Sequence, residues 1–179
     1  NHFNFHQAQA LAAVATPDGG FAVLTENYAD TNGGKNAVLK IDGTGTVVWS
    51  AIIDNPRLPN GLRDLAVTAD GGLLLAGDAR DANFNFQNRL VKLAADGSTA
   101  WEKTYGSTYH STSRIIALAD GNFAISGGRN DGDLSLTKIT PTGDLIWEST
   151  YVKPEYQRAY DVLATADGGL AILGTTQNT

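Results

Sequence analysis

Residues 120–151 read DGNFAISGGRNDGDLSLTKITPTGDLIWESTY, and this stretch decides the fold. It begins with Asp120-Gly121 between two apolar runs, and a second turn, ending in Gly143, precedes Trp147 by four residues. Asp-Gly between apolar strands is a strong hairpin signal, because glycine accepts the positive φ that such turns need. Together with the apolar residues just before it, the stretch predicts two successive β-hairpins.

The same pattern recurs along the chain. An Asp-Gly turn begins at Asp18, Asp70, Asp120 and Asp167, at spacings of 52, 50 and 47 residues. A Gly-x-x-x-Trp motif follows three of these turns, and a lysine stands nine residues before each tryptophan. Features that hold one register through three copies indicate an internal repeat. The motif residues are Gly45 and Trp49, Gly97 and Trp101, and Gly143 and Trp147, and the lysines are Lys40, Lys92 and Lys138.

Four strands repeating at this spacing are typical of β-propeller blades. The expected fold class is therefore all-β, with four-stranded antiparallel sheets as blades and about three and a half blades in one domain, 1–179. The blades are expected at about 8–54, 62–106 and 112–152, with a half blade at 158–179. An unfinished blade exposes a strand edge, which proteins normally avoid. The chain is therefore expected either to belong to a longer propeller or to be completed by another copy.

The repeated tryptophans and lysines have a structural interpretation. Trp49, Trp101 and Trp147 are expected between blades, where a large ring fills the space between twisted sheets. The lysines are expected to lay their stems along the sheet and to bring their ammonium groups near the turn aspartates. The lysines repeat too regularly to form a binding site.

Composition excludes several classes of function. The net charge of −6 leaves no basic footprint for nucleic acid. No apolar run is long enough for a membrane-spanning helix, so membrane insertion is not expected. With no cysteine, disulfides and thiol chemistry are absent. The chain begins at Asn1, so either a leader has been removed or this is a piece of a longer protein.

Two resemblances follow from these motifs. The pattern Ala-Asp-Gly-Gly-(Phe/Leu)-x-(Ile/Leu)-x-Gly, then Lys-(Ile/Leu), then Gly-x-x-x-Trp-x-x-x-Tyr resembles a repeat of secreted bacterial proteins, especially Bacteroidetes proteins exported with a C-terminal sorting domain. It extends from about Ala8 onward and implies a secreted or cell-surface β-propeller without assigned catalytic residues or cofactor. Residues 41–49 are similar to the tryptophan docking motif of quinoprotein dehydrogenases. Those enzymes have more blades, a quinone, calcium and often adjacent cysteines, so this similarity is interpreted as shared blade packing.

Loop lengths predict where binding would occur. The short Asp-Gly turns must lie on one face of the ring, and the longer second-to-third-strand loops and interblade connections on the other, where binding is expected. Phe84 and Phe86 could stack on a sugar or a partner, or fold back as a small satellite core. Tyrosine and arginine in the connections could be binding hot spots or loop anchors. These residues are Tyr105, Tyr109, His110 and Arg114 in one connection, and Tyr156, Arg158, Tyr160 and Asp161 in the next.

Catalytic and metal candidates are few. Asp64 and Asp161 share one repeat position, which Arg114 occupies in the third blade, and they would meet if first strands line the channel. They could serve glycoside chemistry as paired carboxylates, or form a salt-bridged channel wall. Asp131 and Asp133 could offer oxygens to calcium, or belong to a tight turn. No cofactor motif is present.

The leading functional hypothesis is thus a non-enzymatic extracellular binding or scaffold module that recognises a protein or glycan with its long-loop face. One alternative is a glycosidase or lyase that uses the channel acids. The other is a structural subunit that assembles through its open blade edges.

Overall fold

The computed structural model describes residues 8–27, 35–54, 61–80, 86–105, 110–129, 132–152 and 156–177. These residues form fourteen β-strands and no helix. Three antiparallel four-stranded sheets and one two-stranded sheet follow one another, each built from consecutive strands. The prediction of an all-β chain with three and a half propeller blades is confirmed.

Each complete blade contains four consecutive strands. Blade one contains β1 (Ala8–Ala15), β2 (Phe21–Asn27), β3 (Lys35–Ile41) and β4 (Val47–Asp54). Blade two contains β5 (Leu62–Val67), β6 (Leu73–Arg80), β7 (Phe86–Leu93) and β8 (Thr99–Tyr105). Blade three contains β9 (His110–Ala117), β10 (Phe123–Arg129), β11 (Leu134–Ile139) and β12 (Leu145–Tyr151). The half blade contains β13 (Tyr156–Ala164) and β14 (Leu170–Gln177).

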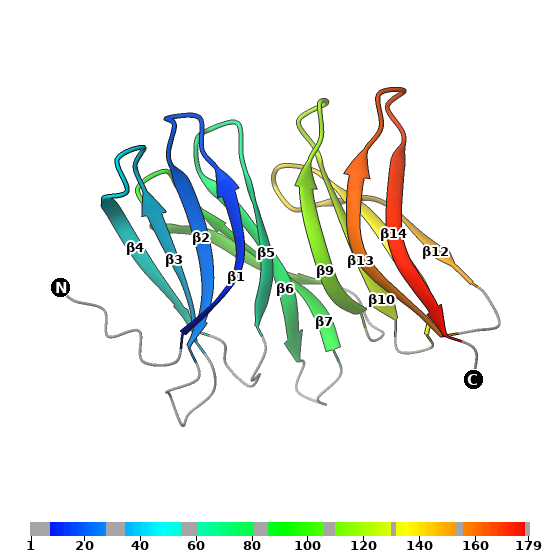
Figure 1. Cartoon of the computed structure of the whole chain (residues 1–179). Helices are drawn as coiled ribbons and strands as arrows, with labels where there is room; N and C mark the ends of the chain where they lie inside the picture. The colour runs from blue at the N-terminus through cyan, green and yellow to red at the C-terminus, as the bar shows by residue number, and fades with distance from the viewer. Residues whose placement is uncertain are drawn as a thin grey trace.

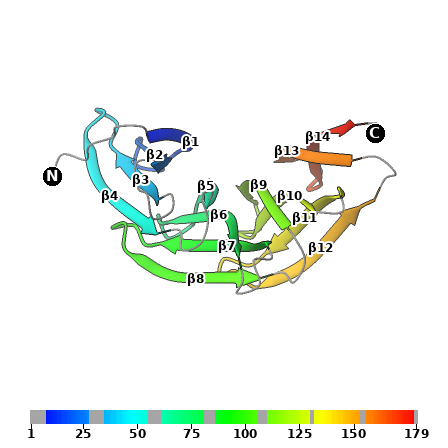
Figure 2. The same ribbon diagram turned by 90° about the horizontal axis from the view of Figure 1, so that it is seen from below.

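The blades stand side by side in an open arc. The first strands β1, β5, β9 and β13 lie on its inner side, and the fourth strands β4, β8 and β12 form its outer rim (Figure 2). The short turns gather at the upper end of the arc, and the two termini lie at its opposite ends (Figure 1). The first strands therefore line the concave side of the arc, which is the condition under which the sequence predicted that Asp64 and Asp161 would meet.

The turns at the upper end share one construction. At Thr68–Gly72, Gly71 has φ +78° and its amide donates to the Thr68 carbonyl oxygen at 2.9 Å. The Asp70 carboxylate accepts from the Gly72 amide at 3.1 Å, which satisfies a backbone group that the tight turn leaves free. Aspartate and glycine at these positions thus fix the hairpin, and with it the register of the first two strands.

The apolar core lies between blades rather than within them. One buried cluster joins Leu24 and Val38 of blade one to Leu73 and Leu75 of blade two. A second cluster joins blade two to blade three through residues that include Leu74, Leu90, Ile115 and Ile125. Strand β6 contributes to both clusters, since alternate side chains point to opposite faces of a sheet.

Each inner strand carries one β-bulge at the same repeat position. The register shifts place an extra residue in β1, β5, β9 and β13: Leu11, Arg63, Ser113 and Tyr160. A bulge bends its strand and re-aims a side chain. All four bulge residues stand seven positions before the turn aspartate of their blade.

A glycine in the second strand makes room for the bulge in three of the blades. Gly77, Gly127 and Gly174 pair with the residue just before the bulge. A Cβ atom at Gly174 would lie 2.7 Å from the Arg158 carbonyl oxygen, which is too close for an unshifted backbone. The repeated glycine that ends the second-strand motif is therefore explained by the close approach of the first strand.

Candidate functional site

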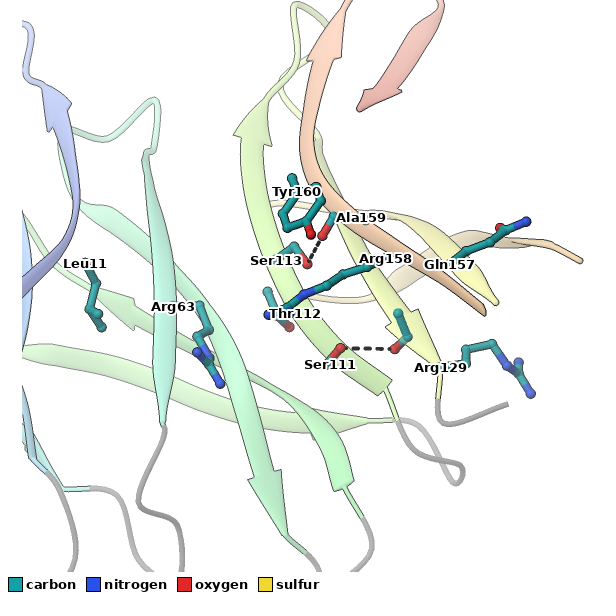
Figure 3. A pocket seen from close by; sticks show the side chains of 11 residues that line it. Leu11, Arg63, Ser111, Thr112, Ser113, Arg129, Gln157, Arg158, Ala159 and Tyr160 are labelled. Atoms are coloured by element: carbon teal, nitrogen blue, oxygen red, sulfur yellow. Dashed lines mark hydrogen bonds between the residues drawn. The ribbon is translucent and has the colours of Figure 1, made fainter. Parts of the chain in front are cut away.

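The four bulge residues line one cavity on the inner side of the arc. The cavity has a volume of about 520 Å³ and is lined by Leu11, Arg63, Ser113 and Tyr160, together with polar residues near the start of β9 and β13 (Figure 3). These strand starts lie at the lower end of the arc, away from the short turns (Figure 1). The cavity thus occupies the channel mouth on the side where the sequence predicted binding.

The charged residues that line the cavity are arginines, although the chain as a whole is acidic. Among the described residues, the charged side chains in the lining are those of Arg63, Arg129 and Arg158. Arg63 Nε lies 3.6 Å from the Asp78 carboxylate, behind the cavity wall. Within the described residues, the contact recorded for the exposed Arg158 guanidinium is with the Tyr160 ring, 5.6 Å from its centroid. Arg158 reaches from β13 toward Thr112 in Figure 3. Its charge is therefore available to a ligand.

Hydroxyl groups add hydrogen-bonding capacity beside these arginines. The Ser113 hydroxyl donates to the Ala159 carbonyl oxygen at 2.9 Å, which ties β9 to β13 across the cavity wall (Figure 3). The Ser111 hydroxyl makes only a long contact of 3.4 Å with the Gly128 carbonyl oxygen. Guanidinium and hydroxyl donors side by side suit carboxylate, sulfate or phosphate oxygens.

A buried aspartate supports the cavity floor. Asp78 accepts a 2.7 Å hydrogen bond from the Thr112 amide, while the Thr112 hydroxyl contacts the Gly77 carbonyl and Asn88 side-chain oxygens at 3.0 Å each. Burial raises the pKa of the Asp78 carboxyl to about 6, against the opposing influence of the Thr112 amide and Arg63. This network joins blade two to blade three at the level of the cavity.

The predicted pair of channel carboxylates is brought together through an arginine. Arg114 Nε lies 3.2 Å from an Asp161 oxygen and 3.5 Å from an Asp64 oxygen. Asp64 also accepts a 2.8 Å hydrogen bond from the Ile115 amide, and burial raises its pKa. Both carboxylates are thus engaged by one guanidinium, which is the geometry of a salt-bridged channel wall.

The remaining sequence candidates lie in several places. Arg158, Tyr160 and Asp161 are strand residues of β13, and Arg114 lies in β9, so the assignment of these four to interblade connections is wrong. The first strands begin earlier than expected, because backbone pairing continues below the bulge. Tyr105, His110 and Tyr156 also lie in strands, at the first or last residue of β8, β9 and β13.

Phe86 stands at the start of β7 and is half-buried, with the Arg80 guanidinium 4.6 Å from its ring centroid. It therefore packs on its own blade. Phe84, Tyr109 and Asp131 lie outside the described residues. Asp133 is buried at the turn before β11. Across the described ranges, no cluster of three or more acidic or histidine side chains could hold a metal ion.

Of the residues that line the cavity, sequence reasoning had singled out Arg158 and Tyr160 and missed the rest, among them the bulge residues Leu11, Arg63 and Ser113. The repeat did contain a signal for them. The position seven residues before the turn aspartate holds Leu, Arg, Ser and Tyr in the four blades, and the positions on either side of it also vary, whereas the turn residues recur. A stretch that varies within an otherwise regular repeat is where a binding surface can develop.

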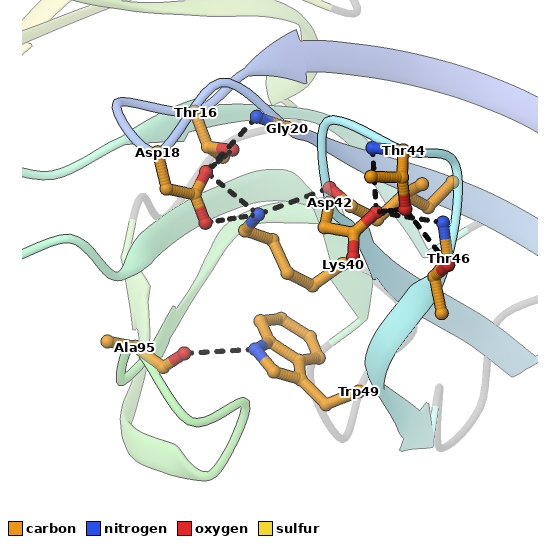
Figure 4. A network of polar contacts seen from close by, with 10 residues as sticks. Thr16, Asp18, Gly20, Lys40, Asp42, Thr44, Thr46, Trp49 and Ala95 are labelled. Carbon is orange, nitrogen blue, oxygen red and sulfur yellow. Dashed lines mark hydrogen bonds and ion pairs between the residues drawn. The ribbon is translucent and has the colours of Figure 1, made fainter.

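The first two repeated tryptophans lie between blades, as expected. The Trp49 indole N–H donates to the Ala95 carbonyl oxygen of blade two at 2.9 Å (Figure 4). A Cβ atom at Gly97 would lie 2.7 Å from the Trp49 ring, and a Cβ atom at Gly143 would lie 2.7 Å from the Trp101 ring. Each ring therefore rests on the glycine turn between the third and fourth strands of the next blade.

The repeated lysines pair with the turn aspartates, as predicted. Lys40 Nζ lies 2.8 Å from Asp18 (Figure 4), and Lys92 Nζ lies 3.0 Å from Asp70. Lys138 Nζ lies 2.7 Å from Asp120. These pairs, with nearby hydroxyl and amide donors, lower the pKa of Asp70 and of Asp120 to about 2. Each pair links the first hairpin of a blade to its third strand.

Comparison with known proteins supports the fold alone. No family model matches the chain, and no curated protein matches it. A protein of unknown function from Bacteroides caccae superposes with a TM-score of 0.59 at 10% identity, covering 97% of this chain and 58% of that protein. A hypothetical protein from Leishmania major gives 0.56 at 7% identity, with 97% and 60% covered. A eukaryotic initiation factor gives 0.54 at 15% identity, with 84% and 34% covered. The chain therefore spans less than two thirds of these structures.

Replacing Asp78 by Asn should change stability in a pH-dependent way. A pKa raised from 3.8 to about 6 means that the folded state holds this proton more tightly than the unfolded chain. Ionisation of Asp78 therefore costs stability as the pH rises from about 4 to about 6. The free energy of unfolding of Asp78→Asn should therefore rise relative to that of wild type between about pH 4 and about pH 6. The difference should stay constant at higher pH and reach at most about 3 kcal/mol. Urea unfolding from pH 4 to 8 measures it.

The exposed turn residue Asp96 is the control for this experiment, since its pKa is lowered by hydrogen bonds from Ser98. Asp96→Asn should gain no stability as the pH rises. An Asp78→Asn protein less stable than wild type above pH 6 would contradict the assignment.

The glycine turns offer a second test, by substitution with asparagine, which tolerates positive φ. Gly97→Asn places a side chain against the Trp49 ring and should cost about 1–3 kcal/mol of unfolding free energy. Gly45 is the equivalent position of blade one, with φ +87° and no neighbour within 4 Å of an added Cβ atom. Gly45→Asn is thus the matched control, and equal losses in the two variants would refute the packing argument.

Proposed function

We propose that this chain is a non-enzymatic binding module of a secreted or cell-surface bacterial protein. It recognises an acidic group of a protein or glycan at the long-loop mouth of its channel. The observation that carries the proposal is the cavity lined by Arg63, Arg129 and Arg158, which has no carboxylate among its described lining residues.

The charge distribution favours an anionic ligand. The chain has a net charge of −6, so a random cavity on its surface would expose carboxylates. Here the lining combines Arg158, whose charge has no described carboxylate partner, with Arg63, Ser111 and the Tyr160 ring. Arginine binds carboxylate and sulfate oxygens in a planar fork, and a tyrosine ring offers a flat face to a sugar or peptide.

The construction of the repeat also favours binding at this position. The blades repeat the residues that pack them together, and they vary the bulge residue that faces the channel. A rigid scaffold with varied side chains at one convergent point is the usual arrangement of a binding site.

The channel carboxylates favour a structural role over a catalytic one. Asp64 and Asp161 are both ion-paired with Arg114, and the Ile115 and Val162 amides donate at 2.8 and 2.9 Å to the same two carboxylate oxygens. Asp64 is also buried, whereas a catalytic pair needs both carboxyl groups within reach of the substrate. The wall therefore serves to hold blade two, blade three and the half blade at a fixed separation.

Calorimetric titration with acidic ligands tests the proposal. The probes are a uronic-acid oligosaccharide, a sulfated oligosaccharide and a glutamate-rich peptide, each with a neutral analogue. One or more acidic probes should bind, with affinity that falls as salt is raised. Arg158→Ala should weaken that binding about tenfold or more, the contribution of one charge-assisted hydrogen bond.

Lys103→Ala is the control, because Lys103 lies on the outer strand β8 and pairs with Asp144. It removes the same charge from the chain and should leave the affinity unchanged. Equal binding of acidic and neutral probes, or equal losses in the two variants, would overturn the proposal.

A further inference from the structure

The exposed apolar side chains of the described chain gather at the two ends of the arc. None of the large hydrophobic residues of blade two whose burial is described is exposed, because blades one and three cover its faces. One exposed group lies on blade one and comprises Phe21, Val47, Val48 and Ile52. The other lies on β12 and the half blade, and includes Leu145, Trp147, Tyr151, Leu163 and Leu173.

Trp147 lacks the contact that the other two tryptophans make. Trp49 and Trp101 rest on the glycine turns that precede β8 and β12. The half blade consists of a first and a second strand, so its third-to-fourth-strand turn is not among the described residues. Trp147 is accordingly 37% exposed. It faces Thr165 and Leu170 across an open groove.

The turn of the half blade lacks the lysine that the other three have. The Asp167 carboxylate accepts from the Thr165 hydroxyl and from the Gly169 amide, the latter at 3.0 Å, and no described lysine reaches it. A Cβ atom at Gly20 in blade one would lie 2.8 Å from Lys40 Nζ, whereas at Gly169 the added atom would meet only its own turn. The half blade thus has the aspartate turn that a repeat lysine would contact, and the position of the lysine ammonium group is not filled by a described residue.

Space for a further pair of strands lies beside these residues. One groove of about 590 Å³ runs between Trp147 and Lys138 of blade three and Leu170 of the half blade. A second, of about 370 Å³, runs along Ile172 and Thr175 of β14. Tyr151 and Leu170 line both grooves. In the described sheet β14 pairs with β13 alone, so its other edge offers free hydrogen-bonding groups.

We infer that β14 and the exposed face of β12 are a docking site for a β-hairpin of the same repeat. The hairpin adds to the free edge of β14 as a third and fourth strand. Its lysine reaches Asp167, and its glycine turn rests on Trp147. The apolar residues that flank this lysine cover blade three, as Val91 and Leu93 beside Lys92 cover blade one.

A second folded copy of this chain does not supply that hairpin. Among the described third-to-fourth-strand turns, the one at Gly45 is the turn that no tryptophan contacts, and it has no neighbour within 4 Å of an added Cβ atom. That turn joins β3 to β4, and β3 already pairs with β2. It therefore cannot add to β14 unless blade one comes apart. The inference is independent of the proposed binding function, since the cavity lies on the inner strands.

The test appends residues 130–152, a third-and-fourth-strand hairpin with its preceding turn, after Thr176. Thr176 is the equivalent of Arg129, because each stands nine residues after its turn aspartate. The protein carries 5-fluorotryptophan, and Trp147→Phe identifies the ¹⁹F resonance of Trp147. The Trp147 resonance should lose its solvent isotope shift in the extended protein, and the melting temperature should rise by about 4 °C or more.

The matched control replaces the glycine equivalent to Gly143 in the appended hairpin by asparagine. Trp147 should then stay exposed. The second measurement adds residues 130–152 as a synthetic peptide, and this peptide should shift the Trp147 resonance saturably while its asparagine version does not. The inference is overturned if Trp147 remains solvent-exposed in both formats. It is also overturned if light scattering shows a dimer of the unextended chain in which Trp147 is already protected.

Discussion

A four-stranded blade of this chain has two apolar faces and can bury them only against its neighbours. Strand β6 shows the constraint directly, because its side chains alternate between the cluster shared with blade one and the cluster shared with blade three. The two junctions between complete blades each have a tryptophan on a glycine turn at the outer rim. Within each complete blade, a lysine pairs with the turn aspartate. The repeated residues are therefore those that packing requires.

The same constraint separates packing from function along the inner strands. A bulge at one repeat position places Leu11, Arg63, Ser113 and Tyr160 in the lining of one cavity on the inner side of the arc. None of the four belongs to the buried core of an interblade junction, although Ser113 donates a hydrogen bond to the half blade. Charge follows this division, since most of the turn aspartates that pair with lysines lie at the upper end, and the arginine cavity lies at the lower end.

Much of the fold could be predicted from the sequence because its determinants are local and repeated. The Asp-Gly turns, the four-strand period and the lysine–aspartate pairs all lie within one blade. The meeting of Asp64, Arg114 and Asp161 was also predictable, since equal repeat positions lie at equal heights on adjacent inner strands. The bulges were not predictable in the same way, because a bulge is a property of the pairing between two strands.

The sequence assigned Arg158 and Tyr160 to a connection between blades for the same reason, namely that strand pairing around the bulge is not visible in the sequence. Polar residues before a short apolar run suggested a loop, but backbone pairing extends below the bulge and makes them strand residues. Their position in β13 links the binding cavity to the open end of the arc. Tyr160 is backed by β14, where Thr175 contacts its hydroxyl at 3.5 Å, and β14 is the strand whose far edge is unpaired. A hairpin added at that edge would leave the cavity open and would stiffen the strand pair that carries Arg158. Completion of the fourth blade would therefore strengthen ligand binding without a new contact to the ligand, because less conformational entropy of β13 and Arg158 would be lost on binding.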